Sequence, residues 1–76
     1  MPAQRLDNAK TREPIALAVA ITLRCDGCIA VHSAAAKKLG ATKEEIAEAL
    51  GVGISVNAGA ALVYSTRMLD AFDATA

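Results

Sequence analysis

The sequence predicts an all-α fold, and three observations support this prediction. Hydrophobic residues make up 54% of the chain, and many of them are alanines, which suit close packing of helices. Signals for the beginnings and ends of helices recur along the chain. No segment has the features of a β-hairpin or of a strand–helix–strand unit, so a β-sheet is not expected.

The size of the chain indicates that one copy needs help to be stable. A chain of 76 residues forms one domain at most, and a domain of this size buries only about 60% of the surface of its unfolded chain. A disulfide between two cysteines three positions apart would constrain the unfolded chain little. We therefore expect the missing stability to come from assembly into a homo-oligomer.

The charge balance excludes two classes of partner. Eight basic residues balance eight acidic ones, so no long-range field would attract nucleic acid or an anionic membrane. The N-terminus has no apolar signal-peptide core, and the longest apolar run, residues 14–23, is too short to span a bilayer. We expect a cytoplasmic protein with no membrane and no nucleic-acid partner. In that reducing compartment a C-x-x-C pair is typically catalytic, redox-sensing or metal-binding.

The first part of the chain predicts a polar arm followed by an apolar helix. Residues 1–12 form the predicted arm, residues 13–73 the helical domain and residues 74–76 a short tail. Pro14 is suited to the first position of a helix, where its missing N–H is not needed. Residues 15–23 are apolar on every side, which indicates burial all round. β-Branched residues allow a strand here, but the alternating alanines and the length favour a helix.

A second helix is expected from about Asp26 to Leu39, with Gly40 as its C-terminal signal. If the two helices fold back on each other around residues 24–27, this helix returns toward Glu13. The predicted inner face of the second helix consists of Cys28, Val31, His32, Ala35 and Leu39.

A capping box, Thr42-Lys43-Glu44-Glu45, predicts the start of a third helix. Its inward residues are expected to be Ile46, Ala49 and Leu50. Each glycine in a helix interior costs about 1 kcal/mol relative to alanine, so Gly51, Gly53 and Gly59 predict a break near residues 57–59. A fourth helix is then expected over residues 58–72, with Leu62, Leu69 and Phe72 on one apolar stripe.

The chemistry is concentrated in one segment, because both cysteines and the only histidine lie within residues 25–32. Two cysteines at this spacing can form a disulfide, bind a soft metal or exchange electrons with a partner dithiol. In a helix, Cys28 and His32 stand at positions i and i+4 on one face. The imidazole could then accept the thiol proton directly or through one water. The start of a helix also favours a thiolate.

Three other interpretations of these residues remain open at this point. Cys28 and His32 could simply be buried helix residues, since isolated buried cysteines are common. A closed zinc site needs four ligands, whereas the chain offers two thiols and one imidazole, so neither a metal nor a cofactor is expected. A thioredoxin-type motif should follow a strand, and no such strand is predicted.

Four residues follow the pattern E-x11-C-x2-C-x3-H without a gap: Glu13, Cys25, Cys28 and His32. The flanking segments IALAVA, LRCDGCIAVH, GATKEEIAEALGV and ALVYSTRMLDAF extend the similarity. From Glu13 to Phe72 the chain resembles the AhpD-like branch of the carboxymuconolactone decarboxylase family. Two positions depart from the family pattern. Pro14, where the family commonly has a leucine, biases Glu13 away from helical geometry. Residues 57–60 are Asn-Ala-Gly-Ala, where relatives often have a glycine-rich stretch and a proline.

The resemblance implies an all-helical oligomer, a trimer or a hexamer, with alkylhydroperoxidase activity. Cys28 would attack a small hydroperoxide and become a sulfenic acid, which Cys25 would resolve as a disulfide. His32 would accept the thiol proton, and Glu13 would orient or recharge His32 through a water. An external dithiol would restore the pair.

Two other functions and a simpler role for Glu13 are also compatible with the sequence. The chain could be a non-enzymatic redox-sensing module whose assembly responds to the dithiol. It could instead be a small-molecule enzyme of the decarboxylase type, although that branch generally lacks the cysteine pair. Glu13 could also be a solvated residue or a cap at a helix N-terminus.

Overall fold

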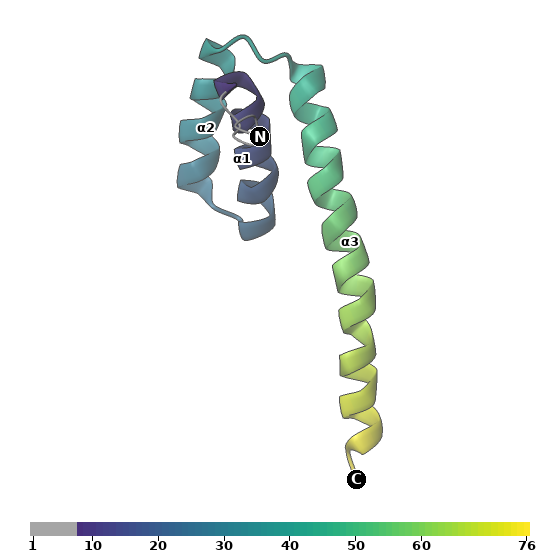
Figure 1. Cartoon of the computed structure of the whole chain (residues 1–76). Coiled ribbons are helices and arrows are strands. Elements are labelled where there is room, and N and C mark those ends of the chain that lie inside the picture. The colour runs from purple at the N-terminus through teal and green to yellow at the C-terminus, as the bar shows by residue number, and fades with distance from the viewer. Residues whose placement is uncertain (1–7) are drawn as a thin grey trace, which may run out of the picture.

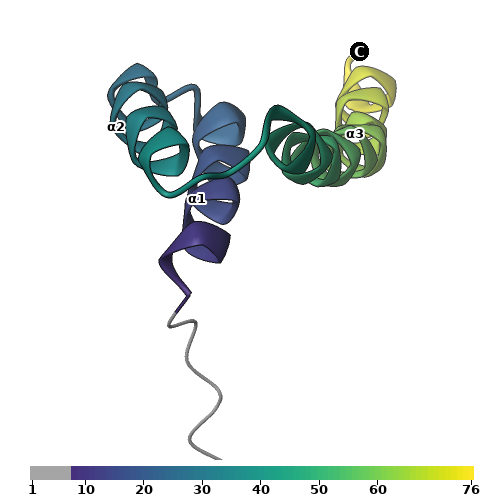
Figure 2. The same ribbon diagram turned by 90° about the horizontal axis from the view of Figure 1, so that it is seen from above.

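Three helices make up the fold in the computed structural model, which describes residues 8–76 (Figure 1). They are α1 (Ala9–Leu23), α2 (Asp26–Lys38) and α3 (Lys43–Ala74). Helix α1 lies in the middle, with α2 along one side and α3 along the other, as the view from above shows (Figure 2). The predicted all-α class is confirmed, and the site residues belong to the antiparallel α1–α2 hairpin.

Helix α1 begins at Ala9, so the predicted start at Pro14 is wrong. The Asn8 side chain caps the helix, because its Oδ1 accepts hydrogen bonds from the backbone N–H groups of Lys10 (3.0 Å) and Thr11 (3.4 Å). Pro14 lies inside the helix, where it removes one backbone hydrogen bond. The cap and the packing of α1 offset that loss. Residues 9–12 of the predicted arm form the first turn, and residues 1–7 lie outside the described part.

The turn between α1 and α2 is tight. Arg24 adopts a left-handed conformation (φ 54°, ψ 45°), and its N–H donates to the last carbonyls of α1. The Cys25 N–H donates to the Ala20 carbonyl oxygen at 3.0 Å. This closing pattern satisfies backbone groups that the end of α1 leaves free. Helix α2 can therefore start at Asp26 and run back along α1, as predicted.

The interior of a single chain is small. Only Leu17, Ala20 and Ala36 are buried among the hydrophobic side chains of the described residues. The predicted inner face of α2 is partly wrong, because Val31 is 65% exposed and Leu39 is 42% exposed. Since α2 packs mainly against α1, its covered stripe is narrow.

The predicted capping box at the start of α3 is confirmed. The Thr42 N–H donates to Glu45 Oε1 at 2.8 Å, and the Glu45 N–H donates to Thr42 Oγ1 at 3.1 Å. The predicted break near residues 57–59 is wrong, because α3 is one helix of 32 residues. Each glycine costs about 1 kcal/mol in a helix interior. An interruption would instead leave the backbone N–H and C=O groups at two new helix ends without partners inside the helix, and the continuous helix avoids that larger cost.

Helix α3 has two different halves. The inner half (residues 43–57) lies beside α1. Gly53 is buried there, and the helices are so close that a Cβ atom on Gly53 would lie 3.1 Å from the Ala18 carbonyl oxygen. The outer half (residues 58–74) extends well past the hairpin (Figure 1) and is exposed throughout. Its predicted apolar stripe is therefore uncovered within one chain. Residues 15–23 are also not buried all round, since Ile15, Val19 and Leu23 are exposed.

Helix α3 is also, by length and composition alone, long and apolar enough to cross a membrane, with a mean hydropathy of 1.6 in its most apolar window. Glycines and small polar residues interrupt its apolar sequence, so α3 contains no uninterrupted apolar run as long as residues 14–23. Core helices of soluble proteins have the same composition, so this property does not identify a membrane protein.

Candidate functional site

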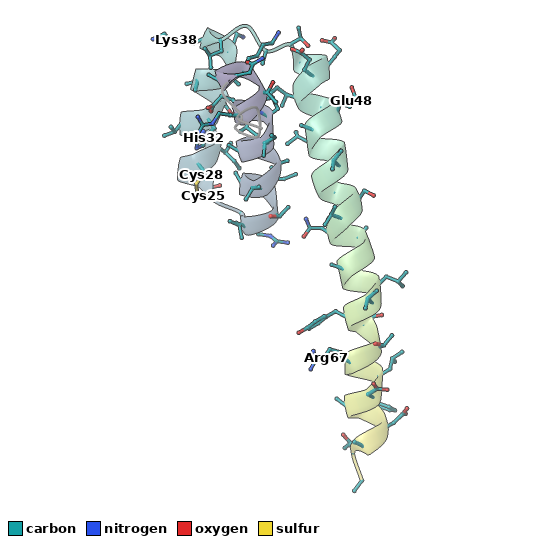
Figure 3. The ribbon with its side chains drawn as sticks, in the orientation of Figure 1. Cys25, Cys28, His32, Lys38, Glu48 and Arg67 are labelled. Atoms are coloured by element: carbon teal, nitrogen blue, oxygen red, sulfur yellow. A yellow bond between two sulfur atoms is a disulfide. The ribbon has the colours of Figure 1, made fainter. Side chains whose placement is uncertain are left out.

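The α1–α2 hairpin brings together the four residues of the E-x11-C-x2-C-x3-H pattern. Cys25 is the N-cap of α2, Cys28 lies in the first turn and His32 lies one turn further along the same helix (Figure 3). Glu13 belongs to α1 and faces α2, which runs antiparallel to it. Residues that are 19 positions apart in sequence therefore become neighbours.

The two cysteines form a disulfide at the start of α2, with their Cα atoms 5.3 Å apart. Cys25 also caps the helix, because its Sγ accepts a hydrogen bond from the Cys28 N–H at 3.3 Å. Both cysteines are only partly buried. The pair thus occupies the positive end of the helix dipole, where developing negative charge on sulfur is favoured, and reagents in solvent can reach it.

Glu13 and His32 are in direct contact. Glu13 Oε1 and His32 Nδ1 are 2.6 Å apart, and the side chains are 17% and 36% exposed, respectively. An ionised carboxylate can only accept hydrogen bonds, so Nδ1 carries the hydrogen and donates it. The lone pair of the other ring nitrogen, Nε2, then remains available as a proton acceptor. A carboxylate in this position holds the ring in one orientation and one tautomer.

This contact corrects two expectations about Glu13. We expected a bridging water between Glu13 and His32, whereas the hydrogen bond is direct. We also expected Pro14 to turn the carboxylate away, but Glu13 is helical because α1 begins five residues before Pro14. The helical geometry points Glu13 toward α2.

Within residues 8–76, no group of three or more His, Cys, Asp or Glu side chains is arranged to hold a metal ion. The imidazole of His32 is instead paired with a carboxylate, and each thiol is paired with the other.

Sequence reasoning missed a second cluster of polar residues, which lies between the end of α1 and the middle of α3. Arg24, Thr22 and Asn57 line one pocket between α1 and α3. Thr22 and Asn57 each interrupt an apolar run, which was the available signal. Because a helix break was expected near residues 57–59, Asn57 was interpreted as part of that break and not as a residue of a pocket.

Three curated relatives are similar to this chain. An uncharacterized protein of Haemophilus influenzae is 55% identical over 65 residues, which are 86% of this chain. An uncharacterized protein of Cupriavidus necator is 36% identical over 66 residues, or 87% of this chain. The uncharacterized protein 4 in cox locus of Paracoccus denitrificans is 39% identical over 64 residues, or 84% of this chain. The aligned part is 58% of the length of each relative.

The family comparison covers the whole candidate site. The profile of the carboxymuconolactone decarboxylase family matches residues 6–71, a range that contains the Glu13–His32 contact, the cysteine pair and most of α3. On this match, the chain belongs to the carboxymuconolactone decarboxylase family.

Proposed function

We propose that this protein is a thiol-dependent peroxidase of the alkylhydroperoxidase type, as in the AhpD-like branch of the family. The direct Glu13–His32 hydrogen bond, one helical turn from a cysteine pair on α2, carries the proposal. An oriented acid–base group beside a thiol is the arrangement that activates a cysteine nucleophile. The aqueous cytoplasm is the proposed location, because a dithiol reductant is available there.

The proposed reaction begins with the reduced pair. His32 Nε2 accepts the thiol proton of Cys28, and the thiolate attacks one oxygen of a small hydroperoxide. An S–O bond forms, the O–O bond breaks, and the leaving alkoxide takes up the proton from His32 to become an alcohol. Cys28 is oxidised to a sulfenic acid in this step, and the peroxide is reduced.

Resolution and recycling complete the cycle. The Cys25 thiolate attacks the sulfenic sulfur, so that an S–S bond forms and hydroxide leaves as water after protonation. In the disulfide-bonded structure the Cα atoms are 5.3 Å apart, which is within the usual range for a disulfide. An external dithiol then reduces the disulfide through a mixed-disulfide intermediate.

Glu13 is proposed as a positioning residue. Its hydrogen bond keeps the Nδ1 hydrogen of His32 away from Cys28 and leaves Nε2 as the proton acceptor. The carboxylate also stabilises the imidazolium that forms when the thiol proton is transferred. Removing it should slow thiol oxidation without abolishing it.

Peroxide consumption with a dithiol reductant tests this proposal. We expect Cys28→Ser to consume peroxide no faster than buffer, whereas Cys25→Ser should still oxidise Cys28 and consume about one equivalent when the external dithiol is left out. Loss of a general base costs about 10²-fold or more, so His32→Gln should slow thiol oxidation by about that factor and Glu13→Gln by less. Glu48→Gln, an exposed glutamate on α3, is the matched control. Equal rates for the wild type and Cys28→Ser would contradict the proposal.

We also propose that the active form is a homo-oligomer, a trimer or a hexamer. The chain exposes 6121 Å², whereas a globular monomer of 7.8 kDa exposes about 4,400 Å². In the described part of the chain, Leu62, Leu69 and Phe72 on α3 are 73%, 59% and 69% exposed. The excess therefore includes apolar surface of the kind that a stable interface buries, about 800 Å² from each partner.

The exposed apolar surface of α3 favours a second candidate, a redox-sensing module whose assembly changes with the dithiol. Light scattering of the oxidised and reduced protein separates it from the peroxidase. A sensor should change mass on oxidation and show negligible peroxide turnover, whereas the peroxidase should keep its mass and turn over. An activity of the decarboxylase type would survive in the Cys25→Ser/Cys28→Ser double variant, which separates that alternative.

A further inference from the structure

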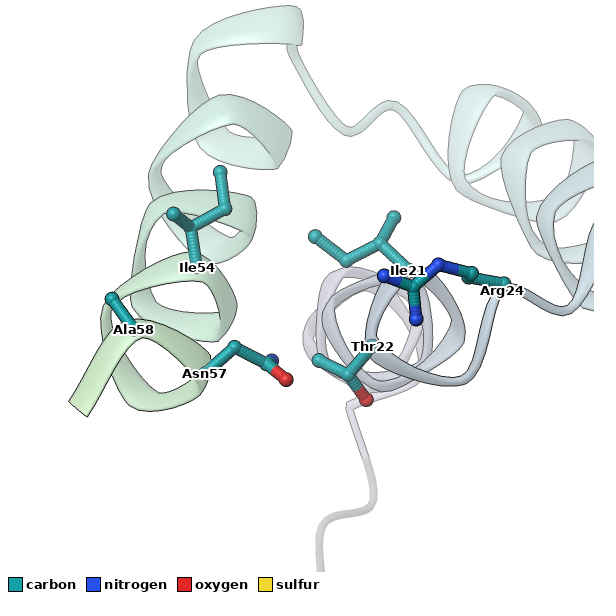
Figure 4. Close-up of a pocket in the computed structure, with 6 residues that line it drawn as sticks. All are labelled: Ile21, Thr22, Arg24, Ile54, Asn57 and Ala58. Carbon is teal, nitrogen blue, oxygen red and sulfur yellow. The ribbon is translucent and has the colours of Figure 1, made fainter. Parts of the chain in front are cut away.

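A pocket of about 390 Å³ lies between the end of α1 and the middle of α3 (Figure 4). It is separate from the disulfide and from the Glu13–His32 contact, neither of which lines it. Its lining residues are Ile21, Thr22, Arg24, Ile54, Asn57 and Ala58. One positively charged group, two polar groups and an apolar wall therefore meet in one place.

The backbone at Arg24 gives a first reason to assign a role to this pocket. Arg24 is the only residue other than glycine with a positive φ in the described part of the chain. A left-handed conformation is unfavourable for residues with a Cβ atom, and helices that end this way usually have glycine at the position. The chain nevertheless has an arginine here, and Arg24 is one of the residues that line the pocket. Within residues 8–76, no carboxylate forms an ion pair with it.

The polar residues opposite Arg24 give a second reason. Asn57 is a polar residue in an apolar part of α3, and its Nδ2 donates to the Gly53 carbonyl oxygen at 2.8 Å. This bond orients the amide and leaves its Oδ1 as a hydrogen-bond acceptor. Thr22 Oγ1 donates to the Val19 carbonyl oxygen at 2.7 Å, so its lone pairs are also acceptors. The Asn57 side chain points toward α1, and Thr22 lies opposite it on α1 (Figure 4).

We propose that this pocket binds a short aliphatic 2-hydroxycarboxylate. The carboxylate would pair with the Arg24 guanidinium, whose planar donors match a carboxylate in a bidentate arrangement. The neighbouring hydroxyl group would donate to Asn57 Oδ1 or Thr22 Oγ1. The aliphatic chain would lie against Ile21, Ile54 and Ala58, which form the apolar side of the pocket. This assignment is independent of the peroxidase chemistry.

NMR titration of the assembled wild-type protein with 2-hydroxy-4-methylpentanoate tests the proposal. We expect saturable shifts of the Arg24 and Asn57 side-chain signals. The critical variant is Arg24→Gly, because glycine suits the left-handed backbone and the fold should be at least as stable to heat. Loss of a charge-assisted hydrogen bond should weaken binding about tenfold or more. Arg12→Ala, which removes a charge from an exposed part of α1, is the control and should bind like the wild type.

A second titration examines the hydroxyl group. The wild type should bind 4-methylpentanoate, which lacks the hydroxyl, more weakly than the hydroxy acid, and Asn57→Ala should bind the two acids alike. Either of two results would overturn the proposal: no saturable shift in the wild type, or equal affinity of the wild type and Arg24→Gly. Equal shifts in the Arg12→Ala and wild-type proteins, together with loss of shifts in Arg24→Gly, would support it.

Discussion

The α1–α2 hairpin and the outer half of α3 are both rich in apolar residues, but they use them differently. In the hairpin, Leu17, Ala20 and Ala36 are buried within one chain, and the Glu13–His32 hydrogen bond joins the two helices. In the outer half, Leu62, Leu69 and Phe72 are 73%, 59% and 69% exposed. The candidate site residues therefore lie in the hairpin, whose core one chain buries by itself. The exposed apolar surface lies in the outer half of α3, which one chain leaves uncovered.

The comparison separates two requirements of the proposed enzyme. The geometry of the site depends on local packing of two helices, which one copy supplies. Stability depends on covering the outer half of α3, which in the proposed oligomer is done by other copies. Variants in the two regions should therefore have different consequences. The first two of the four predictions below compare the regions directly. The third compares the inner and outer halves of α3, and the fourth concerns the inner half, which joins the two regions.

The largest effect is expected from Leu69→Glu in the outer half of α3. If this helix is covered by another subunit, the variant buries an unpaired charge in the interface, which costs several kcal/mol. The oligomer should dissociate, as measured by light scattering. Ala34→Glu adds the same charge to an exposed position on α2 and should leave the mass unchanged. An unchanged mass for Leu69→Glu would show that the outer half is not part of the interface.

The next effect is expected from Leu17→Ala in the core of the hairpin. Truncation of a buried leucine costs about 2–5 kcal/mol, and Leu17 is only 4% exposed. Denaturant unfolding below the concentration at which the oligomer forms should show this loss. Leu62→Ala should cost much less under the same conditions, because Leu62 is exposed in the single chain. Similar losses for both variants would mean that one chain also buries its outer half.

Two glycines of α3 give a smaller and opposite pair of effects. A Cβ atom on Gly53 would lie 3.1 Å from the Ala18 carbonyl oxygen, whereas nothing lies within 4 Å of one on Gly59. We expect Gly53→Ala to destabilise the fold by about 1 kcal/mol through overpacking. Gly59→Ala should stabilise the separated chain by up to about 1 kcal/mol through helix propensity. A destabilising Gly59→Ala that also weakens assembly would place a second subunit against this position.

The smallest effect concerns pH and the capping box. The Thr42 backbone N–H that donates to Glu45 lowers the pKa of that carboxyl group, and the Lys10 charge, 3.5 Å away, lowers it further against the opposing effect of desolvation. A pKa that is lower in the folded state stabilises the fold above the ordinary glutamate value of about 4.3, and this stabilisation is lost as the pH falls through the folded value. Glu45→Gln should remove that pH dependence, and Glu48→Gln should retain it, in unfolding measured from pH 6 to pH 3.

Short-range signals predicted the local parts of the fold well. The Thr42–Glu45 capping box and the glycine signal at Gly40 act within four residues, so the sequence contains all the information that they need. Asn8 was an equally local cap signal for α1, but the preference for proline at the first helical position directed attention to Pro14. The error arose because proline is also tolerated further inside the helix when its cost is offset by packing.

Long-range features were predicted less completely. The antiparallel hairpin implied that His32 returns toward Glu13, but a pattern of spacing cannot distinguish a direct hydrogen bond from one through water. The break expected at residues 57–59 was wrong because helix propensity assigns a cost to each glycine and ignores the continuity of the flanking turns. The exposure of the outer half of α3 could not be predicted, because it depends on how far this helix extends past the hairpin, which helix signals along the sequence do not determine.

The position of the disulfide has a consequence for how the protein can be recycled. Cys25 and Cys28 are joined within the first turn of α2, so the closed loop contains very few residues and restricts the unfolded chain little. The helices that carry Glu13 and His32 do not depend on the S–S bond for their ends. Reduced and oxidised forms should therefore melt at similar temperatures. In the proposed peroxidase, the scaffold would therefore stay folded in the same way through every cycle, and the external dithiol would meet the same surface in every turnover.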